Sequence, residues 1–326
     1  KFSEITENSA SCALGCPGEI IVSIRLAKAE AAAPEAGEKL PAFRKNIEVG
    51  SLEDAPQVLF RAAGAKASHF VLEGLAADTK YAIDVFSAAK AKKSDDGFKL
   101  LTSFSFATLA PEPTAQAGYI GFADATENSI SLNFVCGNGK NRVVLARLGK
   151  MPALPVDGSP LVASTKFGSD SSLLGEDTYC VYNGSGTGKQ PITVTNLASG
   201  KYFFFVAEYN GEGESANYFT KTSNSNPRAK RTALAAPKLL DPKNITSTGF
   251  EIAWSEIQGA ETYFADLATD EKFSQLVDVY AGVDVGRITN FELSDLAPGK
   301  AYFFRVRAVA EDAKSAYSNV VKVVLK

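Results

Sequence analysis

The sequence predicts an all-β protein made of three β-sandwich domains in a row, chiefly because one phrase occurs three times. Each copy runs from a Leu through a short turn to a Tyr and lies between two alternating strands, at 75–81, 197–202 and 296–302. Such a step joins the two sheets of a sandwich, and its Tyr hydroxyl bonds to nearby backbone. The copies lie roughly a hundred residues apart, the usual size of one sandwich. Structural tyrosine corners are therefore expected at Tyr81, Tyr202 and Tyr302.

The strands around this phrase repeat in the same order. The first strand of each repeat alternates, with apolar positions at Ala10, Cys12 and Leu14, at Ile130, Leu132 and Phe134, and at Phe250, Ile252 and Trp254. A later strand matches between the first two repeats, at 22–28 and 144–150. The strand before each corner lies at 70–72, 192–194 and 291–293. The strand after each corner places a Tyr, a large apolar residue and a Val on one face. Period-two alternation indicates strands that are buried on one side.

The segments between the repeats predict domains at 1–111, 112–233 and 234–326. The connectors at 109–114 and 232–237 are short and contain Pro. Short Pro-bearing connectors behave as semi-rigid spacers, so an elongated array is expected. The first two domains also carry a longer segment between the third strand and the corner than the third domain does.

Size and charge exclude several classes of protein. The chain has 326 residues, 45% of them hydrophobic and 22% charged, and its net charge is −3. A chain of this length suits several domains rather than one core. Charges spread without blocks argue against a nucleic-acid surface or an anionic-membrane anchor. The sequence contains no apolar run long enough for a membrane span. It begins with Lys1 and shows no signal peptide, so it reads as a mature or trimmed chain.

The repeats resemble the fibronectin type III superfamily. The third is the most similar, through Trp254, 259–263 and 302–308, and the second resembles a longer variant through features such as Asn138-Gly139 and 182–184. The first repeat is assigned by its match to the second. The resemblance implies immunoglobulin-like sandwiches in an exported, modular protein of the kind that Bacteroidetes bacteria secrete or display at the cell surface. It carries over no catalytic residues, because these domains share none.

The residues themselves offer little catalytic chemistry. His69 is the single histidine, and alternation places it on the outer side of its strand. One histidine excludes a multi-histidine metal site, and no nucleophile motif accompanies it. Asp170 with Glu176 or Asp177 lies in a polar loop, where calcium is conceivable although the EF-type spacing is missing. No enzyme activity, catalytic residue, metal or cofactor is predicted.

The four cysteines leave alternatives open. Cys180 lies on the long segment of the second repeat, and a Cys136–Cys180 disulfide would clip that segment to the domain. Cys12 matches Leu132 and otherwise belongs to the core. Cys12 and Cys16 are too far apart on a straight strand to pair, unless the chain turns sharply between them.

One aromatic stripe is a candidate ligand platform. Phe203, Phe205 and Tyr209 share the outer side of the strand after the second corner. Exposed aromatic rings in a row suit a glycan or a peptide strand. The alternative is that the long segment of the second repeat folds over this face and buries it.

These observations predict a non-catalytic extracytoplasmic protein, at the cell surface or secreted. Its sandwiches would act as spacer and adhesion modules that bind a protein or glycan partner through end loops or a domain junction. The alternative is an accessory region of a larger secreted polysaccharide-degrading enzyme whose catalytic domain is absent here. A carbohydrate-binding module is a third hypothesis, which rests on the aromatic stripe. Because sandwich edge strands can pair between chains, a monomer or a weak dimer is expected.

Overall fold

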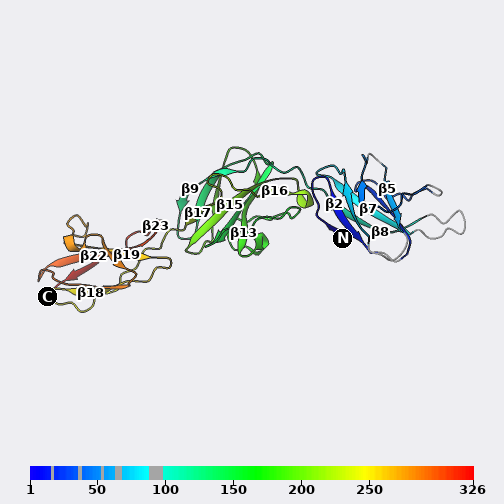
Figure 1. Cartoon of the computed structure of the whole chain (residues 1–326). Helices are drawn as coiled ribbons and strands as arrows, with labels where there is room; N and C mark the ends of the chain where they lie inside the picture. Colours follow the sequence, from blue (N-terminus) through cyan, green and yellow to red (C-terminus); the bar gives the residue numbers. More distant parts are fainter. Residues whose placement is uncertain (16–17, 36–38, 53–54, 63–67, 88–97) are drawn as a thin grey trace.

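The protein is a row of three β-sandwiches, as Figure 1 shows, with the first residue in one end domain and the last in the other. The structure is a computed structural model that describes residues 1–15, 18–35, 39–52, 55–62, 68–87 and 98–326. Within these residues the regular structure consists of strands and short 3-10 turns, without an α-helix. The predicted all-β fold of tandem sandwiches in an elongated array is confirmed.

The first sandwich contains β1 (Phe2–Ser3), β2 (Ala10–Leu14), β3 (Ile20–Leu26), β4 (Asn46–Glu48), β5 (Gln57–Ala62), β6 (Ser68–Glu73), β7 (Lys80–Ser87) and β8 (Lys99–Ala107). One sheet has the order β1-β2-β6-β4 and the other β5-β3-β7-β8. Apolar side chains from both sheets, among them Phe70 and Ile83, form one core between them.

The second sandwich contains β9 (Gly118–Ala125), β10 (Ile130–Val135), β11 (Asn141–Leu148), β12 (Leu173–Gly175), β13 (Thr178–Ser185), β14 (Lys189–Val194), β15 (Lys201–Asn210), β16 (Asn217–Phe219) and β17 (Arg228–Arg231). Two 3-10 turns, η1 (Asp170–Ser172) and η2 (Gly213–Ser215), lie between strands. A sheet of order β14-β10-β9 faces one of order β12-β13-β11-β15-β16, and β17 also pairs with β15. Leu132 and Phe134 on one side meet Val144 and Phe204 on the other in the core.

The third sandwich contains β18 (Phe250–Ala253), β19 (Thr262–Ala268), η3 (Asp278–Tyr280), β20 (Val283–Gly286), β21 (Asn290–Leu293), β22 (Ala301–Ala310), β23 (Ala313–Lys314) and β24 (Val321–Val324). The pair β18-β21 faces a sheet of order β20-β19-β22-β23, and β24 also pairs with β22. Trp254 and Phe304 lie together in this core, with ring centroids 6.2 Å apart.

The three corner tyrosines lie in equivalent surroundings. The strand that follows each corner, β7, β15 or β22, buries its Tyr together with the large apolar residue and the Val that come after it. Each Tyr hydroxyl oxygen accepts a hydrogen bond from the backbone N–H of the residue after the corner Leu. The donors are Ala76 at 2.9 Å, Ala198 at 2.9 Å and Ala297 at 3.0 Å. This contact lets a buried phenol keep a polar partner where the chain crosses between sheets.

The predicted domain limits fall between strands. The limit at 111 lies between the end of β8 and the start of β9, and the limit at 233 lies between the end of β17 and the start of β18. They remain predictions about where independent folding units begin and end.

Candidate functional site at the domain junctions

The predicted aromatic platform on the second sandwich is wrong as a row of three exposed rings, because the long segment covers Phe205 and Tyr209. Phe205 is 1% exposed and Tyr209 is 9% exposed, while Phe203 is half-buried. Phe205 and Tyr209 belong to an outer cluster with six other buried residues, Val143, Leu145, Cys180, Ala207, Ala216 and Tyr218. Leu161, Ala163 and Leu174 of the long segment pack on this outer cluster. Phe205 and Tyr209 cannot stack on a glycan while they are buried in this way, and Phe203 alone does not make a row of rings, so the carbohydrate-binding hypothesis loses its basis.

The predicted Cys136–Cys180 disulfide is also wrong, since both thiols are free. Cys180 lies in the outer cluster on one face of the sheet. Cys136 packs against the core on the other face. The sheet itself therefore separates the two sulfur atoms. Cys12 is free and buried in the first core, in the place that Leu132 takes in the second. Cys16 lies outside the described residues.

We expect Cys180 to resist thiol reagents in the folded protein. Burial raises its pKa to about 12, so at pH 8 roughly one molecule in ten thousand carries the reactive thiolate. Titration with a chromogenic disulfide should give the same thiol count for the native wild type and for native Cys180→Ala, and one thiol fewer for the variant after denaturation. Rapid native labelling that disappears in Cys180→Ala would contradict this burial. Since the ordinary thiol pKa is 9.0, the contribution of this group to stability is complete below about pH 9 and declines as the pH rises toward 12.

The remaining candidate residues form no reactive cluster. His69 is exposed on β6. Glu176 pairs with Arg147 at 3.1 Å, while Asp170 lies in η1. In the part of the chain that the structure describes, no three His, Cys, Asp or Glu residues gather as metal ligands. A helix long and apolar enough to cross a bilayer is not found there either.

Side chains of the second sandwich hold the connector of the first junction. The Asn217 amide, buried on β16, donates to the Ala110 carbonyl at 2.7 Å, and the Asn210 amide on β15 donates to the Pro111 carbonyl at 2.7 Å. The Ala110 N–H donates to the Ser215 carbonyl at 2.9 Å. Each of these bonds fixes the chain at the point where it leaves the first sandwich.

Two further contacts join the first sandwich directly to the second. The Ser215 hydroxyl of η2 donates to an Asp78 carboxylate oxygen at 2.6 Å. Glu7 of the first sandwich accepts from the Asn217 amide at 3.3 Å, and it also holds the connector by accepting from the Glu112 N–H at 2.9 Å. These contacts oppose rotation about the connector, because twisting it would leave several polar groups without partners.

The rest of the connector lies along the loop between β10 and β11. The Asn138 side-chain oxygen accepts from the backbone N–H groups of Thr114 at 3.0 Å and Ala115 at 2.9 Å. Gln116 donates to the carbonyls of Phe219 at 2.6 Å and Lys221 at 2.9 Å. The connector is therefore bonded to the second sandwich on two sides.

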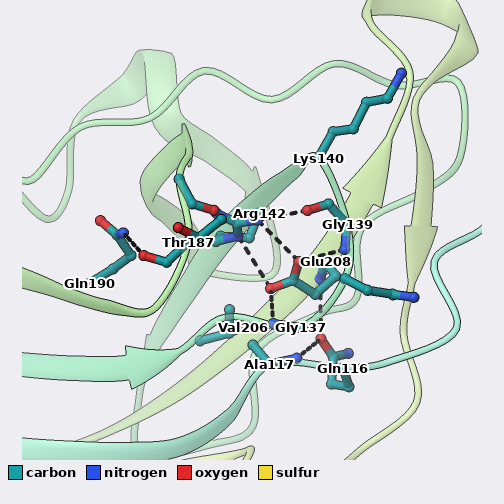
Figure 2. A network of polar contacts seen from close by, with 12 residues as sticks. Gln116, Ala117, Gly137, Gly139, Lys140, Arg142, Thr187, Gln190, Val206 and Glu208 are labelled. Atoms are coloured by element: carbon teal, nitrogen blue, oxygen red, sulfur yellow. Dashed lines mark hydrogen bonds and ion pairs between the residues drawn. The ribbon is translucent and has the colours of Figure 1, made fainter.

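A buried ion pair is bonded to the backbone of that loop, as Figure 2 shows. Arg142 on β11 and Glu208 on β15 are opposite each other in the sheet, 1% and 0% exposed, and make two contacts of 3.2 and 3.3 Å. The Glu208 carboxylate also accepts from the N–H groups of Gly137 at 2.9 Å and Gly139 at 3.0 Å. Arg142 donates to the carbonyls of Gly186 at 2.6 Å and Gly139 at 2.7 Å. Each charge thus has several partners, which a buried ion pair needs in order to be stable.

The second junction depends on charge instead. Arg231 at the end of β17 contacts Asp312 at 3.1 Å and Glu261 at 3.5 Å, both on the third sandwich. Lys201 lies 3.6 Å from Glu311. The Ser199 hydroxyl in the second corner donates to the Gln258 carbonyl at 2.9 Å. Arg231 is 15% exposed, so water screens this pair less than it screens a fully exposed one.

Each junction contains a hollow. The hollow at the first junction measures about 550 Å³, and its lining includes Phe2, Phe106, Glu4, Asp157 and Glu214. The hollow at the second junction measures about 350 Å³ and is lined by residues such as Phe122, Lys230 and Asp312. A concave surface between two domains is a common place for a ligand. The sequence predicts binding through end loops or a domain junction, and these hollows are the concave surfaces at the two junctions.

Sequence reasoning missed an Arg–carboxylate pair in each domain, on the sheet that contains the strand after the corner. The pairs are Arg25–Asp84 at 2.7 Å, Arg142–Glu208 at 3.2 Å and Arg305–Asp266 at 2.8 Å. In two of these pairs, Arg142–Glu208 and Arg305–Asp266, the two residues lie directly opposite each other on neighbouring strands. Opposite charges at facing positions were a usable signal, since directly opposed residues interact most strongly. Using that signal requires the strand register, which depends on the pairing of distant segments.

Comparisons with known proteins give a family match for one of the three sandwiches. A model of the fibronectin type III domain matches residues 235–324, the third sandwich. A crystal structure of chicken CNTN1 FN1-FN3 domains is 11% identical, covers 100% of this chain and 97% of that chain, and has a TM-score of 0.31. A segment of two fibronectin type III domains from chicken tenascin is 14% identical, with 66% of this chain and 99% of that chain covered and a TM-score of 0.39. No curated protein matches the chain.

Proposed function

We propose that this chain is a non-catalytic extracytoplasmic protein, at the cell surface or secreted, whose sandwiches hold binding surfaces for a protein or glycan partner at fixed separations. The observation that carries the proposal is the construction of the two junctions. The first connector is bonded along its length to the second sandwich, and the second junction is closed by ion pairs across the interface. Junctions built in this way restrict bending, whereas a flexible linker would be exposed and unbonded.

The absence of reactive groupings fits the same proposal. The described residues include no cluster of candidate metal ligands, and the single histidine is exposed on β6. Fibronectin type III domains are generally non-catalytic modules, and the third sandwich matches their model. Fold does not determine function, so the argument depends on the junctions rather than on the likeness.

Small-angle X-ray scattering tests the fixed spacing. The maximum dimension of the wild type should match that of the extended row in Figure 1. Arg231→Ala should broaden the distance distribution, because it removes both cross-domain ion pairs of that residue. Arg287→Ala is the matched control, since its contact with Glu256 spans 4.0 Å on an exposed surface within one domain. If the distance distribution of the wild type were as broad as that of the Arg231→Ala variant, the proposal would be overturned.

Location has its own test. An antibody raised against the purified protein should label intact cells of the source organism or detect the protein in the culture medium. Signal confined to the cytoplasmic fraction would contradict the extracytoplasmic part of the proposal and leave the spacing result unaffected.

A further inference from the structure

Strand β8 of the first sandwich has an open edge. It ends the sheet of order β5-β3-β7-β8, and its partner among the described strands is β7. Most of its residues are exposed, and three of them are large and apolar, with Leu100 40%, Leu101 48% and Phe104 40% exposed. An open apolar edge strand is unusual, because proteins normally protect such edges from pairing with other chains.

The N-terminal segment, residues 1–5, lies opposite this edge. β1 pairs with β2 and ends the other sheet of the same sandwich. Between the two sheet edges lie two hollows. One measures about 250 Å³ and is lined by Lys1, Leu14, Thr102 and Phe104 among others, and the other is the hollow of the first junction. The rings of Phe2 and Phe106, with centroids 4.5 Å apart, line the hollow of the first junction. Together these features make a groove along β8, which we call the β8 groove.

The charge of the β8 groove is uneven. Its junction end carries the carboxylates of Glu4, Asp157 and Glu214, and none of the described residues lining that hollow is Lys or Arg. Glu4 also accepts from Ser11 at 2.9 Å, and Asp157 accepts from the Tyr218 N–H at 2.7 Å. The opposite end carries Lys1. An occupant with basic residues toward the junction therefore complements the groove.

We infer that the β8 groove binds an extended segment of a partner protein, which adds as a strand to β8 with basic residues at its junction end. Main-chain hydrogen bonds to an open edge supply affinity in this mode, and alternate side chains supply specificity. The N-terminal segment closes one side and the second sandwich closes the junction end, so a single strand fits better than a second copy, which would bring a whole sheet with it. The inference deepens the proposed function by specifying the kind of partner.

The test uses peptides of eight alternating valine and threonine residues with two lysines at one end, in both orientations. One orientation should bind in titration calorimetry, and hydrogen exchange should slow at the backbone amides of 99–105. Replacing the lysines by glutamates should weaken binding roughly tenfold at low salt. Methylating alternate backbone nitrogens should abolish binding, because it removes the donors that pair with β8.

Protein variants locate the site. Leu101→Lys should weaken binding of the lysine peptide, since it places a charge on the edge. Leu173→Lys, at a residue 49% exposed on edge strand β12 of the second sandwich, should leave binding unchanged. Loss of binding in both variants would place the site elsewhere.

Three further outcomes would overturn the inference: no binding in either orientation, equal binding of the methylated peptide, and protection of 99–105 in a peptide-free dimer detected by sedimentation. The last would identify a second copy as the occupant. Scattering by the free chain tests the spacing separately, so failure here leaves the proposed function standing.

Discussion

Replacing Glu208 by Ala should destabilise the second sandwich by about 3–5 kcal/mol, the cost of leaving one member of a buried ion pair alone. Arg142 is 1% exposed and would keep its charge without a carboxylate. The N–H groups of Gly137 and Gly139 would lose their acceptor as well. An unpaired buried charge and two unpaired donors together place this variant at the severe end of single substitutions.

Hydrogen exchange is the suitable measurement, because three domains need not unfold in one step. Amides of β11 and β15 should exchange faster in Glu208→Ala, while amides of the third sandwich keep their rates. Glu176→Ala is the control: it breaks an ion pair whose carboxylate is 74% exposed, so it should cost less than about 1 kcal/mol. An effect of Glu208→Ala no larger than this control would show that the buried pair is not needed.

A double variant separates the effect of the two charges from the effect of the hydrogen bonds to the neighbouring loop. Replacing Arg142 by Met and Glu208 by Leu removes both charges and keeps much of the volume, and such exchanges are often neutral or stabilising. The double variant should therefore recover a large part of the stability lost in Glu208→Ala. It should not restore the hydrogen bonds to Gly137 and Gly139. Amides of the loop between β10 and β11 should therefore still exchange quickly, even if amides of β11 and β15 regain their protection from exchange.

The architecture was predictable because it depends on local patterns. Alternation in the first strand of each repeat and the Leu-to-Tyr step identify sandwich strands and corners without knowledge of their partners. Tyr81, Tyr202 and Tyr302 each need only a backbone N–H a few residues away. Contacts that span so few residues are visible in the sequence itself.

The errors came from contacts across a sheet face. Phe205 and Tyr209 follow the parity of exposed residues, yet the segment containing Leu161 and Leu174 covers them. Strand alternation tells the two faces apart but does not show that the outer face carries a second apolar layer. Cys136 and Cys180 illustrate the same limit, because a loop residue and a strand residue were paired without knowing which face each would take.

Predicting the junctions would require contacts between residues that are still farther apart in the sequence. Asn217 and Glu7 meet although they are 210 positions apart in the sequence. No local signal marks Asn217 as a junction residue, since Asn is also a common turn residue. The Pro residues of the connectors predict stiffness, but they do not reveal the hydrogen bonds to the first connector, which come from side chains far along the chain.

Gly137→Ala should disturb the first junction itself, with a destabilisation of about 1–3 kcal/mol as in other overpacked sites. A Cβ at this position would lie 2.1 Å from the Ala115 carbonyl oxygen and 2.8 Å from the Gln116 carbonyl carbon, both in the connector. Gly137 cannot retreat, because its N–H is bonded to the buried Glu208 carboxylate. The connector must therefore move away from the second sandwich.

The movement has two expected signatures. The amides of Thr114 and Ala115 should lose protection from exchange, since they donate to Asn138 beside the substitution. The scattering distance distribution should broaden, because the first sandwich would be held by fewer bonds. Gly118→Ala is the matched control: its Cβ would meet its nearest atoms, in Asn224 and Ser223, at an ordinary 3.6 Å. If Gly137→Ala kept both the protection of Thr114 and the wild-type distance distribution, close contact between connector and loop could not be what fixes the first domain in place.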